Sequence, residues 1–205
     1  MKELLIIGAS GHGKVVADIA VQLNKYRRIS FLDDNEKIAT VMGFQRIGAI
    51  SMLETESREK EVIVAIGNAV VRGKLEKWIL GLGFRLAILI HPKAVLAEDV
   101  VLGEGTVVMP GAIINSGSCI GNGVIVNTAC SIDHDCIIKD YAHISVGAHL
   151  AGTVCVGERT WIGAGATVSN NVTICDDVMI GAGAVVVKNI EEAGTYVGVP
   201  AKRLK

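Results

Sequence analysis

Residues 126–150 read VNTACSIDHDCIIKDYAHISVGAHL, and every sixth residue of this stretch, from Val126 to Leu150, is a large aliphatic. The same spacing runs without an insertion from Leu96 to Val186. Four residues after each of these guide positions stands a second, smaller or β-branched residue, such as Cys130 after Val126. The guide positions are Leu96, Leu102, Val108, Ile114, Ile120, Val126, Ile132, Ile138, Ile144, Leu150, Val156, Ile162, Val168, Ile174, Ile180 and Val186.

Two inward positions in every six residues exclude an α-helix, whose faces recur every 3.6 residues. The pattern predicts a parallel β-helix, in which each short strand pairs with the coil before it and the guide residues stack into ladders along a narrow core. This stretch resembles the hexapeptide-repeat transferases. That resemblance implies three hexapeptides in each 18-residue triangular coil and left-handed coiling.

The chain before the repeat has a different pattern. The apolar run 3–7 enters the glycine turn G8-A-S-G-H-G13, an apolar-periodic helix follows, and a second strand over about 29–32 ends at Asp33 and Asp34. An acidic residue some twenty positions after a glycine turn is typical of a nucleotide-binding βαβ unit. Ser10 replaces the middle glycine of the dinucleotide fingerprint, which favours another phosphate-bearing ligand. The alternative is that the glycines only permit a tight turn.

A third strand is expected over 62–66, followed by Gly67, the helix cap Asn68 and a helix to about Leu80. Arg72, one turn into that helix, is either a solvated residue or a phosphate contact. A last strand is expected over 86–90. The predicted fold class is therefore an α/β, Rossmann-like N-terminal domain over 1–91 followed by a left-handed parallel β-helix over 92–205.

Composition narrows the possible functions. The 205 residues carry a net charge of −1, with 50% hydrophobic and 20% charged residues, and no basic cluster suggests a nucleic-acid partner. No apolar stretch is long enough to span a membrane. The five cysteines are odd in number and lack the spacing of a metal finger or a redox motif. We expect reduced, packing cysteines in a cytoplasmic protein.

The most chemically distinctive residues are Asp133, His134 and Asp135, directly after the guide residue Ile132. A histidine flanked by carboxylates is a reasonable general base, provided that the chain turns so that Asp135 can reach the imidazole. Gly152 lies 18 residues further on, one coil along. Its bare backbone amide is suited to stabilising the oxyanion of a thioester under attack.

The other histidines of the repeat occupy different places in the coil from His134. His143 is half a coil from His134, so if both serve one site, two chains must meet there. His91, His143 and His149 could equally be surface residues. A metal site from His134, His143 and His149 is not expected, because these positions do not stack in an 18-residue coil.

Taken together, GASGHG, FLDD, AIGN, VNTACSIDHDC, HISVGAHLAG and VGVPAK resemble the bacterial sugar acetyltransferases of the bacillosamine and sialic-acid type. The resemblance covers essentially the whole chain. It is strongest to enzymes that use acetyl-CoA to N-acetylate a UDP-linked 4-amino-4,6-dideoxy sugar, yielding UDP-diacetylbacillosamine. It implies a nucleotide-linked amino sugar as partner, no metal, and a homotrimer with its active sites at subunit interfaces.

The resemblance also implies roles for particular residues. His134 is the base, Asp135 orients it, and the Gly152 amide holds the thioester oxygen. The relative we compare most directly has a glutamate where this chain has Asp135. The resemblance also implies that the acceptor and the acetyl group lie near Asn127 and His143, and that pantetheine lies along Ala164 and Ala182. The residues that it implies for binding the nucleotide sugar are Ser10, Gly11, His12, Asp33, Asp34 and Asn68.

Three other functions remain open on the sequence alone. An O-acetyltransferase of sialic acid or a polysaccharide would share the architecture and the base. A zinc-dependent, carbonic-anhydrase-like β-helix would require a metal site. An inert nucleotide-sugar-binding or scaffold protein would bind UDP without transferring acetyl groups.

Overall fold

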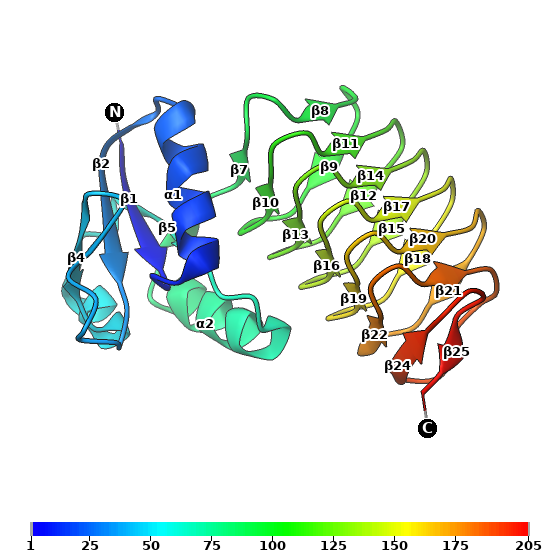
Figure 1. The fold of residues 1–205 in the computed structure, drawn as a ribbon. Coiled ribbons are helices and arrows are strands. Elements are labelled where there is room, and N and C mark those ends of the chain that lie inside the picture. Colours follow the sequence, from blue (N-terminus) through cyan, green and yellow to red (C-terminus); the bar gives the residue numbers. More distant parts are fainter. Residues whose placement is uncertain (1, 205) are drawn as a thin grey trace. The chain divides into compact units, whose positions relative to one another are not determined.

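The computed structural model describes residues 2–204, and the chain divides into two compact units. The first unit ends at Pro92 and the second begins at Lys93. Figure 1 shows an α/β unit and a stack of coils.

The first unit is built on a six-stranded sheet in the order β3-β4-β2-β1-β5-β6. The central strands β1, β2 and β5 are parallel, so their carboxyl ends share one edge. In chain order the elements are β1 (Lys2–Ile7), α1 (Gly11–Gln22), β2 (Tyr26–Leu32), β3 (Thr40–Val41), β4 (Phe44–Gly48), the 3₁₀ helix η1 (Ile50–Thr55), β5 (Glu61–Val64), α2 (Ala69–Gly81), β6 (Arg85–Leu86) and β7 (Leu89–Ile90).

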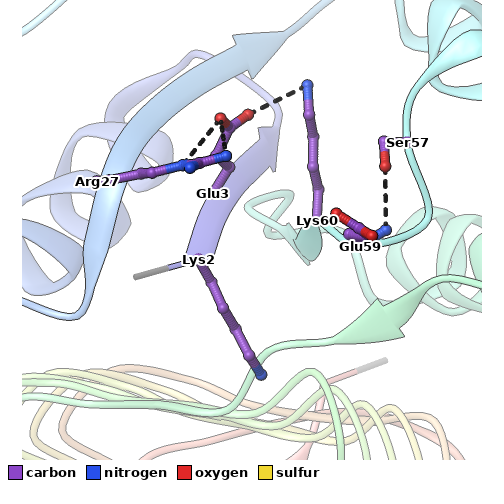
Figure 2. A pocket seen from close by; sticks show the side chains of 6 residues that line it. All are labelled: Lys2, Glu3, Arg27, Ser57, Glu59 and Lys60. Atoms are coloured by element: carbon purple, nitrogen blue, oxygen red, sulfur yellow. Dashed lines mark hydrogen bonds and ion pairs between the residues drawn. The ribbon is translucent and has the colours of Figure 1, made fainter.

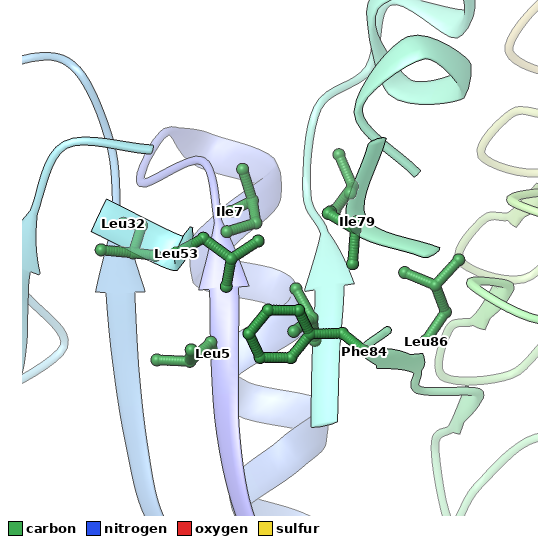
Figure 3. Packing of buried hydrophobic residues seen from close by; sticks show 9 residues of the cluster. Leu5, Ile7, Leu32, Leu53, Ile79, Phe84 and Leu86 are labelled. Carbon is green, nitrogen blue, oxygen red and sulfur yellow. The ribbon is translucent and has the colours of Figure 1, made fainter. Parts of the chain in front are cut away.

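The inner parts of the central strands, Leu4–Ile7 of β1, Ile29–Leu32 of β2 and Val62–Val64 of β5, are largely apolar because both faces of the sheet are covered. One layer of this core joins Leu5 and Ile7 of β1 to Leu53, Ile79 and Phe84 (Figure 3), all at most 3% exposed. Burying one such aliphatic side chain contributes about 1.5–3 kcal/mol. The sheet is therefore a rigid base for the loops at its carboxyl edge.

Glycines let the first loop turn tightly into α1. Gly8 has φ +102°, and a Cβ on Gly13 would collide with the carbonyl oxygen of Gly8. The loop is consequently too compact to accept side chains at these two positions. At the second helix, the expected cap is present, since the Val71 N–H donates to Asn68 Oδ1 at 3.0 Å.

Two features of this unit were not predicted. The segment after Asp34 contains the hairpin β3–β4, which turns through Met42 and Gly43, both with positive φ, and then η1. In addition, the strand expected over 86–90 is two short strands, β6 and β7.

From β8 to β21 the second unit consists of two-residue strands joined by four-residue turns (Figure 1). Partners lie 18 residues apart, as in the pairing of Ile113 with Ser131 and of Ser131 with His149. The strands are β8 (Val95–Leu96), β9 (Val101–Leu102), β10 (Val107–Val108), β11 (Ile113–Ile114), β12 (Cys119–Ile120), β13 (Ile125–Val126), β14 (Ser131–Ile132), β15 (Ile137–Ile138), β16 (His143–Ile144), β17 (His149–Leu150), β18 (Cys155–Val156), β19 (Trp161–Ile162), β20 (Thr167–Val168), β21 (Thr173–Ile174), β22 (Val178–Ile180) and β23 (Val185–Val186).

These strands form three parallel faces. The first face contains β10, β13, β16, β19 and β22; the second contains β8, β11, β14, β17, β20 and β23; the third contains β9, β12, β15, β18 and β21. From Val108 to Val186 every guide residue is at most 3% exposed, so the sixfold rhythm is the core of the coil. The outward-facing positions of the strands and turns carry none of this packing and are free to hold chemistry.

The tail covers the last coil. Strand β24 (Gly194–Val197) pairs in parallel with β22, and β25 (Lys202–Arg203) folds back antiparallel on β24. The reversal ends the parallel ladder and thereby limits pairing with other chains.

Candidate active site

A histidine and a carboxylate are joined at the turn between β14 and β15. His134 Nδ1 lies 2.8 Å from Asp135 Oδ2. The contact is possible because Asp135 has φ +57°, a left-handed conformation that places its side chain beside that of its neighbour. The turn that the sequence required at this point is therefore present.

Two glycines make room for this pair, one coil before it and one coil after it. A Cβ on Gly117 would collide with Oδ1 of Asp135. A Cβ on Gly152 would lie 2.6 Å from Cε1 of the His134 ring and would also collide with Nε2. The imidazole thus lies directly over Gly152, as the 18-residue register predicts, whereas sequence reasoning missed Gly117.

The backbone amide of Gly152 has no hydrogen-bond acceptor among residues 2–204, although its carbonyl accepts from the Asn171 N–H at 3.1 Å. A donor of this kind, fixed beside an imidazole Nε2, can stabilise a negative charge that develops on an oxygen bound there. The pair and the amide together have the composition of a general-base acyl-transfer site.

Asp133 has a different role from Asp135. Its Oδ1 accepts from the His134 backbone N–H and from Asn115 Nδ2, each at 2.8 Å. It supports the turn, while Asp135 alone contacts the imidazole ring. The hydrogen bond that His134 donates to Asp135 raises the pKa of His134, and the negative charges of Asp133 and Asp135 add to this effect.

A second group of candidate residues lies at the other edge of the second face. Asn127 follows β13, and its Nδ2 lies 3.0 Å from Nε2 of His143 on β16. Ala164 and Ala182 are exposed in turns of the same corner, one coil apart, and the Gly183 N–H donates to the Ala164 carbonyl. Within one chain, these residues and His134 therefore lie on different corners of the triangle.

The remaining candidates gather at the carboxyl edge of the first unit's sheet. The Ala9 N–H donates to Asp33 Oδ2 at 2.7 Å, and the Ile50 N–H donates to Asp34 Oδ1 at 2.9 Å. The two carboxylates thus tie the glycine turn and η1 to the end of β2. Asn68, at the end of the next strand, caps α2 on the same edge.

Helix α1 begins beside this rim without a side-chain cap. Ser10 is exposed and makes no capping hydrogen bond, and Gly11 has open space where a Cβ would be. Its first-turn N–H groups are therefore suited to an anionic ligand. Next to them, burial and the nearby Arg72 cation lower the pKa of His12 to about 4, so its imidazole is neutral near pH 7.

Arg72 is neither solvated nor positioned as a surface phosphate contact. Its side chain is only 1% exposed, and Nη1 donates to the carbonyls of Ile66 and Gly67 at 2.8 and 2.9 Å. It braces the loop after β5 from inside. His91 is likewise buried, whereas His149 is exposed and contacts Ser131 Oγ through Nδ1.

A cavity of about 420 Å³ lies elsewhere, beside the amino-terminal ends of β1 and β2 (Figure 2). Its cations are already paired: Arg27 and Lys60 contact Glu3, and Lys2 contacts Glu61. Ion-paired side chains therefore line this cavity, and it lies at the opposite end of the strands from Gly8 and Asp33.

Within the described residues 2–204, no cluster of three or more His, Cys, Asp or Glu side chains is arranged to hold a metal ion. Over the same range, no helix has the length and apolar character needed to cross a membrane.

The fold and site together define a class: hexapeptide-repeat acyltransferases with an added α/β domain. A family model described as the PglD N-terminal domain matches residues 3–79, and one described as bacterial transferase hexapeptide (six repeats) matches residues 156–188. UDP-N-acetylbacillosamine N-acetyltransferase of Bacillus subtilis (strain 168) is 37% identical over 109 residues, a match that spans about half of each chain (50% and 49%).

Solved structures match along the whole length. The acetyltransferase domain of PglB from Neisseria gonorrhoeae FA1090 is 43% identical, with 100% of both chains covered and a TM-score of 0.97. The same domain has been solved in complex with acetyl coenzyme A. PerB from Caulobacter crescentus, solved with CoA and GDP-perosamine, is 36% identical over 100% of this chain and 98% of that one, with a TM-score of 0.95.

The chain belongs to this family of hexapeptide-repeat sugar N-acetyltransferases with a PglD-type N-terminal domain. The predicted fold class, a Rossmann-like domain followed by a left-handed β-helix, and the predicted family are confirmed.

Proposed function

We propose that this protein transfers the acetyl group of acetyl-CoA to the 4-amino group of a UDP-linked 4-amino-4,6-dideoxy sugar, with His134 as general base. The observation that carries the proposal is the His134–Asp135 pair, whose imidazole lies over the unengaged amide of Gly152. The relatives support the reaction class, because they are sugar N-acetyltransferases by name and have been solved with acetyl coenzyme A or CoA.

The mechanism follows from the tautomer of His134. Nδ1–H donates to Asp135, which leaves the lone pair of Nε2 to accept a proton. As the neutral sugar amine forms its bond to the acetyl carbon, its proton passes to Nε2. The thioester oxygen becomes an oxyanion and accepts from the Gly152 N–H. Collapse breaks the carbon–sulfur bond, and the imidazolium returns the proton to the CoA thiolate.

We place the nucleotide at the carboxyl edge of the first unit. The uncapped first turn of α1, with Ser10, Gly11 and His12, is suited to the pyrophosphate. Asp33 and Asp34 lie on the same rim and can accept hydrogen bonds from sugar or base groups there. UDP is proposed from the resemblance to the bacillosamine enzymes, and GDP is the competing nucleotide because it is carried by the substrate bound to PerB.

We propose that two neighbouring chains of a cyclic trimer form each site. His134 lies at one edge of the second face, and Asn127 with His143 lies at the other. In a threefold ring, the first edge of one chain meets the second edge of the next, which brings the two groups together. Ala164 and Ala182 lie on the corner that carries Asn127 and would line the pantetheine.

Subunit mixing tests this arrangement. His134→Ala and Asn127→Ala chains should each be inactive, whereas co-expressed trimers should regain about a quarter of wild-type activity, because that fraction of interfaces pairs two intact edges. No recovery in mixed trimers, with wild-type mass and folding, would place both residues in the same chain's site.

The reaction itself is tested by thiol release from acetyl-CoA. We expect release with UDP-4-amino-4,6-dideoxy-N-acetylglucosamine and a loss of about 10²–10⁴-fold in His134→Ala. His149→Ala is the matched control, because His149 is exposed and lies outside the proposed machinery. Release with the GDP-linked amino sugar alone would reassign the nucleotide, and release with sialic acid alone would assign O-transfer. UDP binding without any release would indicate a binding protein.

We also propose a reducing, cytoplasmic location. The five cysteines, Cys119, Cys130, Cys136, Cys155 and Cys175, are all free in the structure. Cys130 and Cys136 fill inward positions of the coil, where burial raises their thiol pKa values and keeps them unreactive. Thiol titration of freshly isolated protein should find five reduced cysteines.

A further inference from the structure

Four side chains on and beside the first face form a connected cluster: Asn127, His143, Ser145 and Trp161. Strand pairing sets His143 directly beside Trp161, one coil along. Asn127 and Ser145 occupy the turn position after β13 and β16, respectively. The proposed function uses Asn127 and His143, while Ser145 and Trp161 have no role so far.

The orientation of the Asn127 amide follows from its neighbours. Oδ1 accepts from the Thr128 backbone N–H at 2.8 Å, so the NH₂ group is the one that faces His143. An NH₂ group only donates, and Nε2 of His143 must therefore be the acceptor. This fixes the proton of a neutral His143 on Nδ1, because the two ring nitrogens of a neutral imidazole cannot both be acceptors.

The imidazole is also held from its other side. Its ring centroid lies 4.7 Å from that of Trp161, with an interplanar angle of 32°. Aromatic rings at this separation attract each other by about 0.5–1.5 kcal/mol. The indole is itself anchored, since Trp161 Nε1 donates to Ser145 Oγ at 2.5 Å, and Ser145 is only 5% exposed.

We propose that Trp161 and Ser145 are positioning residues that hold the His143 imidazole in the Nδ1-protonated form whose Nε2 accepts from Asn127, on the acceptor side of the site. This rests on the proposed function. Nε2 of His143 is occupied by Asn127, so His143 does not take the amine proton through that atom. His134 then accepts the proton, whereas His143 holds the Asn127 amide in place on the acceptor side of the site.

The two anchoring contacts have separable effects. Trp161→Phe keeps a ring beside His143 but loses the hydrogen bond to Ser145, whereas Trp161→Ala loses both. A displacement of about 1 Å of a group that positions the reactants can lower the reaction rate on the order of 10²-fold. Met179→Ala is the matched control, because Met179 is the next outward residue on this face and, like Trp161, is 37% exposed.

The experiment combines kinetics with nitrogen NMR of the full-length protein. We expect Trp161→Ala to lower kcat/KM for the amino sugar by about 10–100-fold with an unchanged KM for acetyl-CoA, Trp161→Phe to recover most of that loss, and Met179→Ala to have no effect. The ¹⁵N shifts of His143, assigned by His143→Gln, should show a protonated Nδ1 in the wild type and tautomer exchange in Trp161→Ala.

A wild-type His143 protonated on Nε2 would overturn the proposal, as would a Trp161→Ala variant that loses stability but keeps its kinetic constants. If the wild type released no thiol with any amino sugar, the proposed function would fall and the positioning role with it. The NMR result would still show whether the indole fixes the tautomer, so the two failures are distinguishable.

Discussion

Gly152→Ala is the most direct test of the site, because it adds one methyl group and removes no hydrogen bond. The backbone φ of Gly152 lies outside the left-handed range, so alanine is compatible with the turn. The new Cβ would lie 2.6 Å from His134 Cε1, whereas ordinary contacts begin near 3.4 Å. The imidazole must therefore move by about 1 Å, which also lengthens its hydrogen bond to Asp135.

A displacement of this size should lower kcat by about 10²-fold, equivalent to about 2.7 kcal/mol of transition-state stabilisation. The KM for acetyl-CoA should change little, because the amide remains in place. Thiol release under saturating acetyl-CoA measures kcat, and thermal unfolding monitors the fold. Gly81→Ala is the matched control: Gly81 ends α2, has open space for a Cβ and lies outside the proposed machinery.

Wild-type kcat in Gly152→Ala would refute the reasoning, since it would mean that His134 does not act from its position over Gly152. Loss of activity together with a large fall in the unfolding temperature would also count against it, because a surface turn that merely accommodates a moved imidazole should not unfold the coil.

Other predictions concern neighbouring parts of the structure. Asp135→Asn removes the main cause of the raised His134 pKa, so the acidic limb of the kcat profile should move to lower pH, as should the imidazole titration by NMR; an unmoved limb would contradict the pairing. Gly117→Ala, at φ +74° and in collision with Asp135, should lower both kcat and the unfolding free energy, the latter by about 1–2 kcal/mol in denaturant titration, and equal stability would contradict it. Arg72→Met should lower the free energy of unfolding by about 2–3 kcal/mol and raise the KM for the nucleotide sugar but not for acetyl-CoA, with Arg72→Lys as control. An unchanged KM for the nucleotide sugar would show that Arg72 does not support the binding rim.

The repeat was readable from the sequence because its physics is local and periodic. Each guide residue from Val108 onwards is buried, and the fixed 18-residue coil places Gly152 beside His134 by counting alone. The same counting, run backwards from Asp135, reaches Gly117. Gly117 carries no functional group and contributes only the space that Asp135 occupies, so no chemical pattern in the sequence points to it.

The first unit was less readable because its details depend on tertiary contacts. Arg72 carries a charge, and a charged residue on a short helix is normally solvated, yet here the loop carbonyls of Ile66 and Gly67 accept its hydrogen bonds in the interior. The hairpin through Met42 and Gly43 pairs only two residues of β3 with two of β4, which leaves almost no periodic signal in the sequence. The contact between His143 and Trp161 could not be predicted from the sequence, because it depends on both the strand register and the orientation of the two rings.

The clearances at Gly117 and Gly152 have a consequence for recognising or building such sites. A catalytic pair on a stacked coil has a footprint three layers deep: one layer presents the pair, and the layers above and below must each give up a side chain. A search for His-Asp alone would therefore return many turns in which the ring and the carboxylate have nowhere to lie. Transferring the pair to another β-helix would require a glycine at both neighbouring positions. The space that these glycines leave is needed as much as the histidine and the aspartate themselves.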